Sequence, residues 1–177
     1  MLPLLPPAHL QTLSTGEPGE GLPCDAKDHQ PLLLGACTRD QILNHRVVFK
    51  DRTAQAEPSE ALRFRWMAIQ RPFTVVVAFG SWCSDSQHEL PSFLALEGQT
   101  NPFVEVHFIG VARAKEIPTG AWPSGLPLEN AVRVPTAWIF ALGPGSSQQL
   151  VGSVVEHPSK PGETFAESIV ELMEQAK

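Results

Sequence analysis

The feature that most constrains this chain is an apolar, β-branched run that leads directly into a helix signal. The run "FTVVVAFG" occupies residues 73–80, and its length and composition are typical of a strand buried on both faces. Residues 84–98 then carry Leu90 and Phe93 at helical spacing and end in glycine, which predicts a helix. A buried strand followed at once by a helix predicts an α/β fold.

The elements that follow extend this sheet. Residues 103–111, "FVEVHFIGV", form the next apolar run, and a right-handed crossover makes this strand parallel to the first. Residues 112–133 contain several prolines and glycines, so we expect a long loop there. Residues 135–142 and 148–156 are apolar runs joined by a short Gly-containing turn, which predicts an antiparallel hairpin. Residues 162–175 predict an amphipathic helix, and helices can cover both faces of the sheet.

The N-terminal part of the chain has a different pattern. Residues 1–37 are rich in proline, glycine and polar side chains, which predicts an irregular arm. Thr38 and Gln41 form a capping-box pattern, and a helix is expected over about 39–46. Residues 58–70 predict a second helix.

Three parts follow from these patterns. They are the irregular arm (1–37), a helical extension packed on the core (38–71), and the sheet domain (72–177).

Charge and hydropathy exclude several classes of partner. The chain has 177 residues and a net charge of −6, which argues against nucleic acid as a partner. Its longest apolar run, residues 73–79, is too short to cross a membrane. The start "MLPLLPPAHL" is broken by prolines and has no basic residue before it, so a floppy arm is favoured over a signal peptide. With only three cysteines, a cytoplasmic, reducing location is expected.

Cys83 lies at the predicted strand-to-helix turn. The unpaired N–H groups and dipole of a helix N-terminus favour an anion there, so this thiol is expected to ionise more readily than a free one. Asp85, in the same first turn, opposes that effect. Trp82 would shield one side and could pack against a substrate. The alternative is an inert thiol buried as a small core residue.

The segments "WCSDS", followed by Pro91, and "VRVPTAWIF" together resemble the thioredoxin family. That family carries Trp-Cys-x-x-Cys at this corner, a proline at the same offset in the helix, and a cis-proline that faces the cysteines. The resemblance covers residues 72–177 and implies a thioredoxin fold, a central mixed sheet flanked by helices. It implies substrate-binding roles for Val134, Pro135 and Thr136, by strand-like pairing with substrate backbone. The alternative is a trans proline that merely starts an edge strand.

Two departures from the family pattern define the expected chemistry. Ser86 replaces the second cysteine, and Val77 replaces the buried aspartate of the family. A single thiol cannot resolve its own mixed disulfide, so the resemblance implies monothiol chemistry. In this W-C-x-x-S variant, Cys83 would attack or hold the disulfide of glutathione or of a protein. Ser86 would hydrogen-bond the thiolate, and no cofactor is implied.

Other residues are weaker candidates. Glu156 and His157 follow the last strand and are expected near the cysteine corner, or as ordinary turn residues. Cys24 and Cys37 could resolve a mixed disulfide, although incidental cysteines are favoured. The histidines and cysteines show no metal-ligand spacing. The second hypothesis for the whole chain is a non-catalytic module that binds a peptide or partner protein beside the cis-proline.

Overall fold

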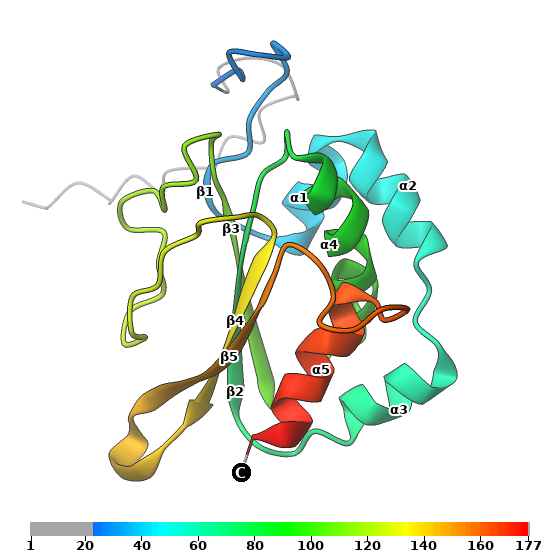
Figure 1. Ribbon diagram of the computed structural model, residues 1–177, viewed down its shortest axis with the longest axis vertical. Coiled ribbons are helices and arrows are strands. Elements are labelled where there is room, and N and C mark those ends of the chain that lie inside the picture. Colours follow the sequence, from blue (N-terminus) through cyan, green and yellow to red (C-terminus); the bar gives the residue numbers. More distant parts are fainter. Residues whose placement is uncertain (1–22, 177) are drawn as a thin grey trace, which may run out of the picture.

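The computed structural model describes residues 23–176. In that part of the chain, five strands form one mixed sheet with the order β1-β3-β2-β4-β5 (Figure 1). The strands are β1 (Gly35–Cys37), β2 (Phe73–Phe79), β3 (Val104–Gly110), β4 (Thr136–Leu142) and β5 (Gln148–Val155). The pair β2–β3 is parallel, as the crossover predicts, and the other three pairs are antiparallel. The predicted hairpin of β4 and β5 is therefore confirmed.

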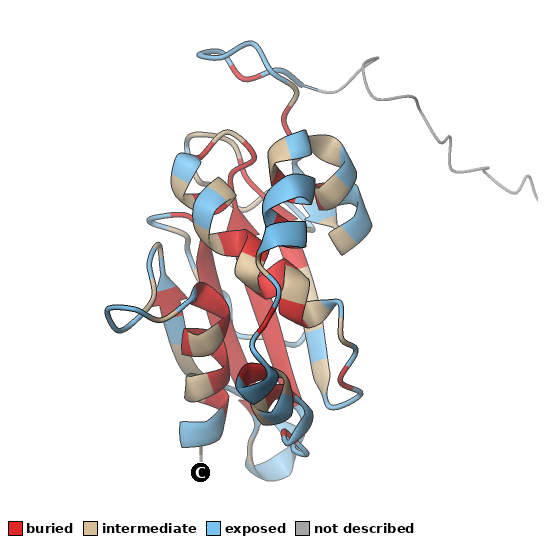
Figure 2. Ribbon diagram, turned by 90° about the vertical axis from the view of Figure 1, so that its right-hand side faces the viewer, coloured by how far each residue is buried: buried red, intermediate tan, exposed pale blue. Residues whose placement is uncertain are grey.

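The helices of the described chain gather on one face of this sheet (Figures 1 and 2). They are α1 (Arg39–His45), α2 (Val47–Gln55), α3 (Glu60–Met67), α4 (Ser84–Glu97) and α5 (Phe165–Gln175). The opposite face is covered by the long loop 112–133, so the expectation that helices can cover both faces is wrong for these residues. Trp122 of that loop packs edge-on against Trp138 and Phe140 of β4, and apolar loop side chains replace a second helical layer.

Alternate residues of β2 build the two halves of the core. Val75, Val77 and Phe79 pack with the helices, whereas Val76 and Ala78 pack beneath the loop. All seven residues of β2 are buried, because neighbouring strands occupy both edges and both faces are covered. The unbroken apolar run in the sequence therefore reflects a central strand, which ends beside the candidate site.

Two elements were missed in the sequence. The three-residue strand β1 pairs antiparallel with β3, although this stretch was expected to belong to an irregular arm. A segment this short has no period of its own, and the exposed edge of β3 supplies its hydrogen bonds. The N-cap residue of α2, Arg46, makes no side-chain cap hydrogen bond, so the sequence carries no start signal for this helix. Residues 1–22 of the predicted arm lie outside the described residues.

Local capping explains where α1 and α5 begin. Thr38 and Gln41 form the expected capping box at α1, and Thr164 with Glu167 forms a second one at α5. These reciprocal bonds satisfy N–H groups that a helix start leaves unpaired. None of the described helices has both the length and the apolar character required to cross a bilayer.

Candidate functional site

Cys83 is the N-cap residue of α4, with φ of −89° and ψ of 125°. Its main-chain N–H donates to the Gly80 carbonyl at 3.0 Å, and its own carbonyl accepts from Gln87 at 3.0 Å. The turn between β2 and α4 needs glycine at position 80, because an added Cβ would lie 2.6 Å from the Trp82 ring. The strand end and helix start therefore fix Cys83 at the corner expected from the sequence.

The Cys83 thiol faces the main chain that precedes β4. Its Sγ donates to the Val134 carbonyl oxygen across 3.3 Å, and the residue is 9% exposed. The Val134–Pro135 peptide bond is cis, as the sequence resemblance implied. Thr136 opens β4, but its buried hydroxyl donates to the Arg133 carbonyl at 2.8 Å. The structure thus brings Val134 and Pro135 next to Cys83, whereas the Thr136 side chain is engaged within its own turn.

Ser86 has a different partner from the expected one. Its Oγ is fully buried and accepts the Gly80 N–H at 3.1 Å. Among the described residues, this is the hydrogen bond that the hydroxyl forms, and none joins it to the Cys83 sulfur. Ser86 therefore holds the turn that carries the cysteine.

Trp82 is also already engaged. Its Nε1 donates to the Val111 carbonyl at 2.9 Å. The Cζ of Arg113 lies 4.8 Å from the ring centroid, and the Lys115 ammonium lies 5.9 Å away. Both distances allow cation–π attraction. The ring serves as a platform for cations, which is a role the sequence did not predict for it.

Arg113 is held in place by a carboxylate from the N-terminal segment. Its Nε and Nη2 donate to the two oxygens of Asp25 at 2.7 and 2.6 Å. The Asp25 side chain is 3% exposed and that of Arg113 is 37% exposed. The hydrogen bonds from Arg113 hold the pKa of Asp25 well below its usual range. The Asp25 carboxylate raises the pKa of Arg113, and the negative charge of a Cys83 thiolate adds a smaller contribution in the same direction.

Sequence reasoning missed Asp25 and Arg113, because they are 88 positions apart and no local pattern joins them. Asp25 lies in a turn closed by its bonds with His29 and Gln30. Leu33, further along the same segment, donates from its N–H to the Ser81 hydroxyl at 3.4 Å. The segment that follows residue 22 is thus fastened to the strand-to-helix turn.

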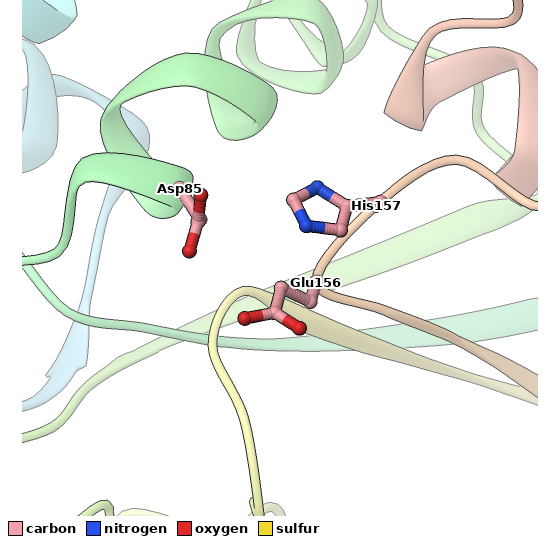
Figure 3. A group of neighbouring side chains, drawn as sticks. All are labelled: Asp85, Glu156 and His157. Atoms are coloured by element: carbon pink, nitrogen blue, oxygen red, sulfur yellow. The ribbon is translucent and has the colours of Figure 1, made fainter.

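Asp85, Glu156 and His157 face one another on the other side of the corner (Figure 3). Each offers a ligand atom, and these atoms lie within 4.8 Å of one another. Glu156 also accepts from Arg133 at 2.8 Å and donates its N–H to the Pro135 carbonyl at 2.6 Å. The expected proximity of these residues to the site is therefore seen. Their donor set is one that divalent cations accept, although the sequence showed no metal-ligand spacing.

The remaining cysteines occupy different environments. Cys37 lies in β1 with its Sγ 3.7 Å from the Phe108 carbonyl, and burial raises the pKa of its thiol to about 12. Cys24 is exposed and pairs with Pro31 through an isolated β-bridge. Val77, at the position of the family's buried aspartate, is fully buried among the helix-facing core residues.

Two solved structures are similar to this chain in fold. One is a protein of unknown function from Pseudomonas aeruginosa, with 19% identity and a TM-score of 0.53, covering 79% of this chain and 90% of that one. The other is an HIV epitope scaffold, with 20% identity and a TM-score of 0.54, covering 81% of this chain and 94% of that one. No family model and no curated protein matches the chain. The likeness supports an α/β fold with a mixed sheet.

Proposed function

We propose that this protein performs monothiol thiol–disulfide exchange at Cys83, on a thioredoxin-like fold. The observation that carries the proposal is the position of the Cys83 sulfur, at the N-cap of α4 and 3.3 Å from the Val134 carbonyl beside Pro135. A thiol that lies at the start of a helix and against an irregular main-chain segment has the setting expected of a nucleophile.

The hydrogen bonds around the sulfur suggest how it is activated. The thiol donates to Val134, and no side-chain cap bond is made at the start of α4. A thiolate has no proton to donate, so ionisation releases the sulfur from that carbonyl. It can then accept from the N–H groups of the first turn, which lack partners within the helix. These donors and the helix dipole stabilise the negative charge.

The exchange reaction balances without a cofactor. The Cys83 thiolate attacks one sulfur of a disulfide, the disulfide bond breaks, and the second sulfur leaves as a thiolate. A mixed disulfide forms between Cys83 and the substrate, which is glutathione or a protein. An external thiolate then attacks this mixed disulfide and restores Cys83, because no second cysteine stands at position 86. The cytoplasmic, reducing compartment expected from the cysteine count would supply that thiol.

The surface beside the sulfur supports a polypeptide as one substrate. Val132 and Leu128 precede the Val134–Pro135 bond and are 79% and 69% exposed. Exposed apolar side chains in the segment that leads to this bond offer contact area for an extended peptide. In this proposal Val134 and Pro135 line the substrate position.

The test is formation of a mixed disulfide. The full chain is incubated with oxidised glutathione at neutral pH, followed by intact mass measurement and peptide mapping. We expect one glutathione adduct on the peptide that contains Cys83, and none at that position in Cys83→Ser. A chain that stays unmodified at Cys83 under excess oxidised glutathione would count decisively against the proposal.

A binding module is the second candidate, and the exposure of Cys83 favours it. The residue is only 9% exposed and its thiol is already hydrogen-bonded, as in a structural cysteine. In that case the surface beside Pro135 would hold a peptide without chemistry. Partner binding that is unchanged in Cys83→Ser supports this candidate, whereas loss of binding with the thiol contradicts it.

A further inference from the structure

Arg113 keeps part of its hydrogen-bonding capacity unused. Asp25 occupies the Nε–Nη2 edge of the guanidinium. The N–H groups on Nη1 have no hydrogen-bond partner among residues 23–176. The side chain is 37% exposed, and its cationic group rests on the Trp82 ring at 4.8 Å. A guanidinium that is fixed on one edge, with the N–H groups of the other edge unpaired among the described residues, can receive an anion with little further ordering.

The strand order places this cation beside Cys83. Cys83 follows β2, Arg113 and Lys115 follow β3, and these two strands are parallel neighbours. Glu156 follows β5, on the opposite side of β2 in the sheet. Arg113, which pairs with Asp25, and Lys115 therefore flank the corner on the β3 side. Asp85 and Glu156 face each other on the β5 side, where Glu156 pairs with Arg133 (Figure 3).

We propose that Arg113 is a specificity-determining residue that binds a carboxylate of the disulfide substrate of Cys83. The inference rests on the proposed exchange reaction and names its substrate class, disulfides that carry carboxylates near the sulfurs. Asp25 is the positioning residue that orients the guanidinium, and the guanidinium lies over the face of the Trp82 ring. The chemistry at sulfur is unchanged: Cys83 bonds to one sulfur of the anionic disulfide and the other sulfur departs as a thiolate.

A charge series of small disulfides tests this assignment. The full chain is treated separately with dithiodipropionate, a dianion, with hydroxyethyl disulfide, which is neutral, and with cystamine, a dication. The rate of mixed-disulfide formation at Cys83 is followed by peptide mapping. In Arg113→Gln we expect the rate with the dianion to fall about threefold, because one cation at a half-exposed site is removed. The rate with the neutral disulfide should hold steady, and the rate with the dication should rise.

Two matched variants complete the design. Arg63→Gln removes the same charge from an exposed ion pair with Glu57 on α3, at the far end of the sheet (Figure 1), and should leave all three rates unchanged. Arg113→Lys keeps the charge but lacks the guanidinium that Asp25 orients, so its rate with the dianion should lie between those of the wild-type chain and Arg113→Gln. A folding defect would change all three rates in the same direction, so opposite responses of the dianion and the dication support Arg113 as the anion site.

The outcomes separate this inference from the proposed function. If Cys83 reacts with hydroxyethyl disulfide but Arg113→Gln leaves the dianion-to-dication rate ratio unchanged, the role of Arg113 is refuted and exchange at Cys83 stands. If Cys83 reacts with none of the three disulfides, both ideas are wrong.

Discussion

The Cys83 thiol is hydrogen-bonded to the main-chain oxygen of Val134 across 3.3 Å, and this contact ties the start of α4 to the chain that enters β4. Cys83 follows β2 and Val134 precedes β4, and these two strands are antiparallel neighbours with Ala78 opposite Thr136. The same sulfur is therefore both a structural donor and the proposed nucleophile. These two roles respond differently to substitution.

Replacement of Cys83 separates the two roles. Cys83→Ala leaves the nearby carbonyl without its donor, which is expected to lower the free energy of unfolding by about 1 kcal/mol. Cys83→Ser keeps a donor and should cost less, yet it abolishes the glutathione adduct as completely as alanine does. Urea denaturation followed by circular dichroism measures the first effect, and peptide mapping of the segment around position 83 measures the second. Equal losses of stability in Cys83→Ala and Cys83→Ser would contradict the role of the thiol as a donor to Val134.

Ser86→Ala tests the role of the serine that stands in place of a second cysteine. The substitution removes the acceptor of the buried Gly80 N–H, and an unsatisfied buried N–H costs about 1–3 kcal/mol. We expect lower stability in urea and only a small change in the alkylation rate of Cys83. Ser92→Ala is the comparison, since its hydroxyl accepts the N–H of buried Ala166 at 3.2 Å further along α4, and it should lower stability without changing the alkylation of Cys83. The opposite pattern, full stability with slow alkylation, would restore the role of thiolate stabiliser predicted from the sequence.

The Asp25–Arg113 pair makes stability depend on pH in the acid range. Because the pKa of Asp25 is lowered in the folded chain by the hydrogen bonds from Arg113, the folded state favours the carboxylate. This stabilisation is fully present above the unfolded-state pKa of about 3.9 and is lost as pH falls below it, toward the lower folded value. Thermal melts should therefore show a constant Tm difference between the wild-type chain and Asp25→Asn above about pH 5. The difference should narrow as the pH falls to about 2. A difference that is independent of pH would exclude the charged pair as its source.

Cys37 is expected to be unreactive in the folded protein. Burial raises the pKa of its thiol to about 12, so almost none of it is thiolate at neutral pH and it is a poor resolving thiol for Cys83. Iodoacetamide at about pH 8 should label the exposed Cys24 in the native chain, and Cys37 only after unfolding in urea. Peptide mapping of the native and unfolded samples distinguishes the two. Equal labelling rates for Cys24 and Cys37 in the native chain would contradict the partly buried position of Cys37.

The same burial has a consequence at alkaline pH. A thiol whose pKa is raised on folding contributes stability that is fully present when the pH is below its unfolded-state pKa of about 8.5. That contribution is lost as the pH rises toward the pKa of the thiol in the folded state. Cys37→Ala should remove this loss, so the wild-type Tm should decline more steeply than that of the variant above about pH 9. Parallel declines would show that Cys37 does not ionise differently in the two states.

Local signals in the sequence were sufficient for the central elements. The unbroken apolar run of β2, the capping boxes of α1 and α5, and the short turn between β4 and β5 each encode an element within a few residues. They also place Cys83 at the N-cap of α4. Propensity, capping and turn chemistry act over one or two turns of chain, and for that reason they can be read without a partner segment.

The sequence by itself determined strands β2 to β5, most helices and the place of one cysteine at a helix start. Only the tertiary structure decided that the helices share one face, that Ser86 bonds to Gly80, and that Asp25 holds Arg113 over Trp82. These contacts depend on which distant segments pack together and on which polar groups remain to be satisfied there. No local period encodes a bond between residues 88 positions apart, since the path of the chain through the whole fold brings them together.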